Sequence, residues 1–184
     1  PQPQDDGVER RASALRAQAA EVDGPLLVDA RLGVGIVAAR GVGDAHVRSL
    51  AVQALARLAP DEAAVVVEAD ASWAWIDALP HRVDRRVVEG RALVRIVGDD
   101  VEVTLASAAD AAGLPRDCRI VAEGRLDVVT LADRSCTPSL LAAREAAAAA
   151  GRLAEAAEAA GTDLAAHGTT SDADTIRDTA LAQP

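Results

Sequence analysis

The chain has 184 residues, of which 50% are hydrophobic and 26% are charged, and its formal net charge is −10. This length suits one domain with a buried core, and the apolar fraction is that of a globular protein. The acidic charge argues against sequence-independent binding of nucleic acid, which needs Lys and Arg to neutralise phosphates. No stretch approaches the roughly 20 apolar residues that span a bilayer.

The apolar residues are mostly Ala, Val and Leu, and Phe, Tyr and Met are absent, so the core must be built from small aliphatic side chains. The two cysteines, Cys118 and Cys136, have a spacing that fits no zinc or redox motif. We therefore expect reduced, structural thiols in a reducing compartment. Because Met is missing even at position 1, the chain is expected to be either processed or cut out of a longer protein, and we favour an excised domain.

The first 22 residues predict a disordered, Pro- and Asp-rich stretch followed by a lead-in helix over residues 8–22. Gly24-Pro25 then breaks the chain. Two short apolar runs follow, Leu26–Val28 and Val34–Val37, and we interpret both as strands.

Helical spacing of apolar residues predicts a helix over Asp44–Leu58, with Asp44 as its N-cap and Pro60 ending it. The unbroken apolar run Ala63–Val67 is typical of a strand covered on both faces, as in a parallel sheet. Strand, helix and strand in this order indicate an α/β fold.

Further along, apolar patterning predicts four more strands, and Gly98-Asp99-Asp100 predicts a hairpin turn. An Ala-rich helix is expected over residues 138–160, capped by Thr137 or Ser139 and stopped by Gly161. Residues 23–161 would then form the domain, and residues 162–184 a linker or disordered tail. The four strands are expected at residues 92–97, 101–105, 119–122 and 126–131.

The most distinctive segment is Ser72–His81, which resembles the Trp-x-Trp…Leu-Pro-His stretch of actinobacterial FtsK/SpoIIIE-type ATPases. The segment Leu114–Val121 is similar to the Leu-Pro-x-x-Cys-x-x-Val segment of that family, and the resemblance covers residues 24–160. The residues that carry the signature are Trp73, Trp75, Leu79, Pro80 and His81.

This resemblance implies a degenerate P-loop or RecA-like sheet, mainly parallel and flanked by helices. More narrowly, the chain looks like the degenerate ATPase-like domain of type VII secretion motors, which lies between transmembrane helices and the working ATPase modules. The expected location is therefore the cytoplasmic face of a membrane, with tethering supplied by segments outside this chain.

A working phosphate loop needs Gly-x-x-x-x-Gly-Lys-Ser/Thr, because Lys reaches the β and γ phosphates and the hydroxyl holds Mg²⁺. Here the corresponding segment is Ala39–His46, and the chain contains no Lys. The remaining candidates for a degenerate phosphate loop are Arg40, Gly41 and Gly43, although a solvated Arg and turn glycines are the plainer interpretation. A carboxylate at Asp44, at the expected helix N-terminus, would oppose an anion.

The resemblance also implies a metal-coordinating acid at the end of strand 63–67, where Glu68 and Asp70 stand. Either both carboxylates are solvated, or they retain a residual Mg²⁺ or nucleotide site. Neither His46 nor His167 has further ligands at metal spacing, so a zinc site is not expected.

Trp73 and Trp75 are the only aromatic residues. At least one should be buried with its indole N–H hydrogen-bonded, and a role at a protein interface is the alternative. For His81 we expect a structural hydrogen bond.

Together these features predict a non-catalytic, P-loop-ATPase-like module of a larger FtsK/SpoIIIE-family translocase or secretion motor, acting in domain docking or regulation. Its partners would be neighbouring ATPase domains or a protein substrate, without direct nucleic-acid contact, and no cofactor is expected. One alternative is a weak nucleotide- or Mg-binding domain with residual ATPase activity. Another is a structural spacer between membrane stalk and motor.

Overall fold

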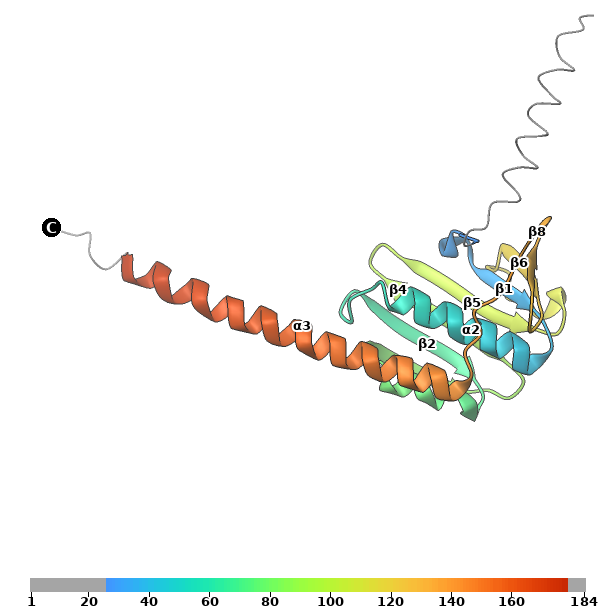
Figure 1. Cartoon of the computed structure of the whole chain (residues 1–184), viewed down its shortest axis with the longest axis horizontal. Helices are drawn as coiled ribbons and strands as arrows, with labels where there is room; N and C mark the ends of the chain where they lie inside the picture. Colours follow the sequence, from blue (N-terminus) through green and yellow to red (C-terminus); the bar gives the residue numbers. More distant parts are fainter. Residues whose placement is uncertain (1–25, 179–184) are drawn as a thin grey trace, which may run out of the picture.

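The computed structural model describes the backbone of residues 26–178 and the side chains up to residue 161. The predicted stretch at residues 1–22 lies outside the described residues. The described chain forms a single mixed sheet with helices packed on it (Figure 1). In chain order the elements are η1 (Ala30–Leu32), β1 (Val34–Val37), α2 (Arg40–Leu55), β2 (Ala63–Ala69), η2 (Ala71–Ala78), β3 (Arg82–Val87), β4 (Ala92–Gly98), β5 (Glu102–Ala108), η3 (Ala111–Gly113), β6 (Ile120–Gly124), β7 (Val129–Leu131), β8 (Arg134–Cys136) and α3 (Ala143–Asp178).

The eight strands follow the order β3-β2-β4-β5-β1-β6-β7-β8 across the sheet. Three neighbouring pairs, β1 with β5, β1 with β6 and β2 with β3, are parallel. The other four, β2 with β4, β4 with β5, β6 with β7 and β7 with β8, are antiparallel. The α/β class is therefore confirmed, but the prediction of a mainly parallel sheet is wrong.

Short connections explain three of the antiparallel pairs, β4–β5, β6–β7 and β7–β8, because a parallel neighbour needs a crossover of a dozen or more residues. The predicted turn at Gly98-Asp99-Asp100 is confirmed: it joins β4 to β5, and the Gly98 N–H donates to the Val101 carbonyl at 2.8 Å. Strands β1 and β2, joined through α2, run in the same direction but are separated by β5 and β4. The connection through α2 thus joins two strands of the same direction, as expected for an α/β arrangement, and η2 joins the parallel neighbours β2 and β3.

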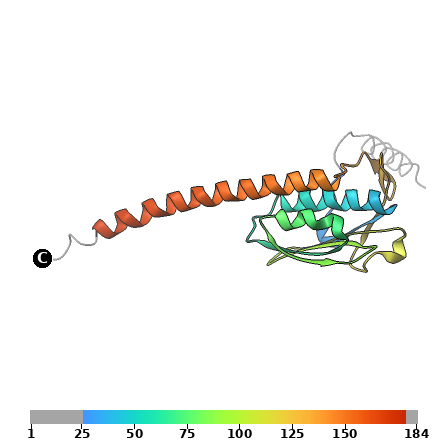
Figure 2. The same ribbon diagram turned by 90° about the horizontal axis from the view of Figure 1, so that it is seen from below.

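Figure 2 shows α2, η2 and the start of α3 on the same face of the sheet. Along β2 the residues facing this helical layer are buried and the alternate residues are half-buried, as expected for a strand with one covered face. The opposite face carries a small second cluster, in which Leu93 and Ala106 pack against Cys118 and Leu114. The largest fully buried side chains of the described residues are Trp73, Leu55, Ile76, Ile96, Leu105 and Val47.

Helix α2 begins four residues earlier than predicted, at Arg40, and its N-cap is Ala39. Asp44 is therefore not the N-cap but lies buried in the second turn. Backbone hydrogen bonds mark this earlier start, because the N–H groups of Val42 and Gly43 both donate to the Ala39 carbonyl at 2.9 Å. The helix ends at Leu55, and Leu58 lies in the turn that follows.

The strand predictions at 34–37, 63–67, 92–97, 101–105 and 119–122 correspond to β1, β2, β4, β5 and β6. Residues Leu26–Val28 form no strand, although their apolar pattern suggested one. The predicted strand at 126–131 shortens to β7. Strands β3 and β8 were not predicted at all, because the arginine-rich β3 and the three-residue β8 both lack a continuous apolar run.

Helix α3 begins at Ala143 rather than near Pro138, and it continues through Gly161 to Asp178. The backbone stays helical at Gly161, with no neighbouring atom near the position of a Cβ, so this glycine does not act as a stop. Both views show the helix leaving the sheet and projecting beyond it (Figures 1 and 2). No helix in the described part of the chain is long and apolar enough to cross a membrane.

Candidate functional site

The candidate site lies where β1 ends and α2 begins. Only Ala38 and Ala39 separate the strand from the helix. The Ala38 N–H donates to the Ala108 carbonyl of β5 at 3.0 Å, so this backbone donor is already used. A connection this short cannot wrap around a phosphate as a glycine-rich loop does.

The two glycines of the predicted loop are helical residues and not turn residues. At Gly43 a Cβ would lie 2.8 Å from the Ser107 Cβ, so the missing side chain allows α2 to pack closely on β5. Around Gly41 a Cβ would meet no atom within 4 Å. Gly43 therefore serves helix packing, while nothing in its surroundings requires a glycine at position 41.

Arg40 is bound by acids of this same chain. Its Nη2 lies 2.6 Å from Oδ2 of Asp70, just after β2, and 3.5 Å from Oε2 of Glu89. Asp70 also accepts a hydrogen bond from the Ser72 N–H at 2.8 Å and caps η2. Hydrogen bonding from Ser72 and the Arg40 guanidinium hold the pKa of Asp70 below its usual value. The structure thus joins two residues that the sequence assigned to separate phosphate and metal positions.

Glu68 has a different partner. Its Oε2 lies 3.1 Å from Nη1 of Arg91, and Glu68 stands opposite Leu93 in the β2–β4 register. Neither Glu68 nor Asp70 is simply solvated, because each is ion-paired to an arginine. Among the described residues, no group of three or more His, Cys, Asp and Glu side chains is placed to hold a metal ion.

The buried Asp44 and Arg48 and the half-buried Ser107 form a polar row between α2 and the sheet. The Ser107 hydroxyl donates to Oδ1 of Asp44 at 3.3 Å. Burial raises the pKa of Asp44 above its usual value, although the positive charge of Arg48 opposes this effect. The expectation that Asp44 places negative charge at the helix N-terminus is therefore wrong. Asp44 lies in the second turn of α2, and its carboxylate faces β5.

Arg48 continues this row toward the tryptophans. Its Nη2 donates to the Ser72 hydroxyl at 2.9 Å, and its guanidinium carbon lies 5.2 Å from the centre of the Trp73 ring. Burial lowers the pKa of Arg48, and Asp44 partly offsets this. Sequence reasoning missed this residue because Arg48 resembles any other charged residue on a helix.

Both tryptophans of the signature are buried in η2, and their ring centroids lie 5.7 Å apart. The expectation of burial is confirmed. Neither indole N–H has a hydrogen-bond partner among the described residues, so the expected bonds are absent there. Trp73 and Trp75 thus fill the core between the sheet and the helical layer.

The other three signature residues, Leu79, Pro80 and His81, are also buried or half-buried. Leu79 is buried and Pro80 is half-buried. His81 is buried too, and its Nε2 lies 3.2 Å from the Leu58 carbonyl, which confirms the expected structural hydrogen bond. This bond ties the start of β3 to the turn after α2.

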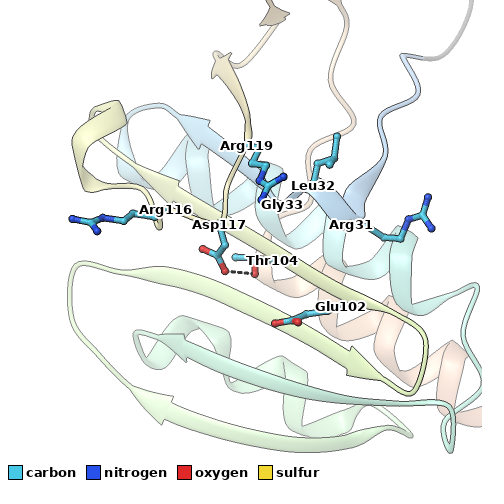
Figure 3. Close-up of a pocket in the computed structure, with 8 residues that line it drawn as sticks. All are labelled: Arg31, Leu32, Gly33, Glu102, Thr104, Arg116, Asp117 and Arg119. Carbon is cyan, nitrogen blue, oxygen red and sulfur yellow. Dashed lines mark hydrogen bonds between the residues drawn. The ribbon is translucent and has the colours of Figure 1, made fainter.

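A cavity of about 290 Å³ lies at the other end of β1 (Figure 3). In its lining, Asp117 accepts a hydrogen bond from the Thr104 hydroxyl at 2.7 Å. Figure 3 shows the guanidinium groups of Arg31 and Arg116 pointing away from each other, so these cations do not converge on one ligand. The lining residues are Arg31, Leu32, Gly33, Glu102, Thr104, Arg116, Asp117 and Arg119.

Comparison of the chain with family models, with curated proteins and with solved structures gave no match.

Proposed function

We propose that this chain is a non-catalytic, P-loop-ATPase-like module of a larger FtsK/SpoIIIE-type translocase or secretion motor, acting in domain docking or regulation. The family assignment rests on the Trp-x-Trp…Leu-Pro-His resemblance. The geometry at the start of α2 supports the absence of catalysis.

The ion pair between Arg40 and Asp70 is the observation that carries this proposal. In a working site of this kind, a cation neutralises the phosphates and an acid holds Mg²⁺, so each faces the nucleotide. Here the two side chains meet directly at 2.6 Å. Binding Mg-ATP would require breaking this pair, and the chain has no Lys to replace the charge on the phosphate side.

The backbone gives a second argument. A phosphate loop presents several free N–H groups, whereas here only Ala38 and Ala39 separate β1 from α2, and the Ala38 N–H donates to the Ala108 carbonyl. The helix start is therefore a packed junction between β1, α2 and β5.

Isothermal titration of the protein with Mg-ATP tests the proposal, combined with measurement of phosphate release. We expect neither heat of binding in the micromolar range nor turnover. Micromolar binding together with hydrolysis would refute the non-catalytic assignment.

The alternative of a weak nucleotide or Mg²⁺ site predicts a different result for the acids. If Glu68 and Asp70 held a metal, the variant Glu68→Ala/Asp70→Ala would lose any titration signal, while Asp110→Ala, an acid at η3, would keep it. The ion pairs of Glu68 with Arg91 and of Asp70 with Arg40 count against this alternative.

The spacer alternative has its own support in α3. The 36 residues of this helix span about 54 Å at 1.5 Å per residue, and part of it projects beyond the sheet (Figure 1). Replacing the domain within the parent protein by an inert domain of equal span separates the two ideas. A spacer would be replaceable without loss of motor activity, whereas a docking or regulatory module would not.

A further inference from the structure

Strand β3 forms one edge of the sheet and has six residues, Arg82–Val87. The Val88 N–H donates to the Ala69 carbonyl of β2 at 2.9 Å. Alternate residues of a strand direct their backbone groups to the same side, so Arg82, Asp84 and Arg86 share this inward direction. The N–H and C=O groups of the intervening residues then point outward from the edge, where no strand of residues 26–178 pairs with them.

This edge is complementary to a second copy of itself. In an antiparallel pair centred on Arg85, each outward-bonding residue meets another outward-bonding residue: Arg85 opposes Arg85 of the second copy, and Val83 opposes Val87. These are the hydrogen-bonded positions of an antiparallel ladder. The register therefore satisfies the free backbone groups of both copies.

The charges of the edge agree with the same register. Asp84 of each copy opposes Arg86 of the other at the non-hydrogen-bonded positions, where side chains of opposing residues lie closest. All of Arg82, Asp84 and Arg86 are exposed, and none forms an ion pair with the part of the chain that the structure describes. Two cross-strand ion pairs would form in the dimer.

The remaining positions of β3, Arg85 and Val87, are also compatible with this pairing. Arg85 of one copy would lie opposite Arg85 of the other. The charge of each Arg85 is already offset by Asp77 of the same copy, whose Oδ2 lies 2.8 Å from Arg85 Nη2. Val87 is 60% exposed in the monomer and would be covered by Val83 of the second copy. The opposite edge, β8, has only three residues and offers a much shorter ladder.

We infer that β3 is a self-association edge, through which two copies of this chain form a continuous sheet about a two-fold axis perpendicular to it. In this register odd-numbered residues oppose odd-numbered residues and even-numbered residues oppose even-numbered ones. Side chains that face the helical layer in one copy therefore lie beside side chains that face it in the other, and both helical layers lie on the same face of the continuous sheet. The inference does not depend on the proposed function.

Sedimentation equilibrium of the whole chain over the micromolar to millimolar range tests the inference. We expect a reversible monomer–dimer equilibrium. The single variants Asp84→Arg and Arg86→Asp place like charges opposite each other and should each weaken dimerisation at least about tenfold. Arg134→Asp, a matched reversal on edge strand β8, should leave the dimer constant unchanged.

The double variant Asp84→Arg/Arg86→Asp exchanges the charges and restores both cross-strand pairs, so it should dimerise within about threefold of the original chain. Circular dichroism melting of every variant shows that each one is folded. A chain that stays monomeric at all concentrations overturns the inference. So do folded single variants that dimerise normally, or a folded double variant that fails to recover.

Discussion

The imidazole of His46 lies against the backbone of Gly124, where a Cβ would come within 2.9 Å of its Cδ2 and Nε2 and within 2.7 Å of Ile36 Cγ2. This close approach lets Nε2 of His46 reach the Arg125 carbonyl at 3.0 Å and ties α2 to the end of β6. The substitution Gly124→Ala should therefore destabilise the protein by about 1–3 kcal/mol through overpacking. Urea unfolding of both proteins measures the difference.

Gly151 in α3 is the matched control for this substitution, because a Cβ there meets no atom within 4 Å. Gly151→Ala should stabilise the protein by up to about 1 kcal/mol, since alanine favours the helix. Equal effects of the two substitutions would show that the contact with His46 is unimportant.

The stability of the protein should fall on acidification because of His46. Burial lowers the pKa of His46 below 6.5, and its hydrogen bond to Arg125 opposes this only in part. The unfolded chain then binds the proton more readily, so the stabilising contribution is complete above pH 6.5 and is lost as the pH falls toward the lower folded value. The free energy of unfolding should drop by up to about 1 kcal/mol between pH 7.5 and pH 5.5.

Urea unfolding of the original chain and of His46→Gln at both pH values checks this. Glutamine does not titrate and can keep a donor for the Arg125 carbonyl, so the variant should lose less stability on acidification. An identical pH dependence in both proteins would assign the effect to other groups.

The sequence predicted those parts of the fold that depend on local pattern. The apolar run at Ala63 identified β2, and Gly98-Asp99-Asp100 identified the β4–β5 hairpin. Strand β3 was missed because it has only Val83 and Val87 as apolar residues among arginines, which is the composition of an exposed edge. The mixture of parallel and antiparallel pairs depends on which strands become neighbours in the sheet, and local sequence patterns do not determine this.

The candidate site was predictable in its residues but not in its contacts. Arg40 and Asp70 were both singled out, yet they are 30 residues apart, and only the placement of α2 beside the end of β2 brings them together. The burial of Arg48 had no local signal either, because its apolar surroundings come from η2. The sequence alone shows that lysine is missing, whereas the ion pair between Arg40 and Asp70 could be found only from the structure.

Arg48 should be important for stability even though it is charged. Its alanine variant loses the hydrogen bond to Ser72 and the stacking on Trp73, and it leaves a gap beneath α2. We expect Arg48→Ala to cost about 2–3 kcal/mol. Thermal and urea unfolding provide the measurement, with Arg57→Ala, at an exposed position just after the same helix, expected to change stability by less than about 0.5 kcal/mol. A similar, small effect at both positions would contradict a structural role for Arg48.

The two cysteines, both free, should differ strongly in reactivity. Burial, aided by the negative charge of Asp117, raises the pKa of Cys118 from 9.0 to about 11. Since the thiolate is the reacting form, a shift of this size lowers its population at pH 8 by roughly a hundredfold, before any effect of limited access.

In the variant Cys136→Ser, the remaining Cys118 should react with iodoacetamide much more slowly in the native state than in urea. The variant Cys118→Ser keeps the half-buried Cys136, which should react at a rate closer to that of the unfolded chain. Rapid native alkylation of Cys118 would show that β1 and the segment before β6 open far more readily than their packing implies.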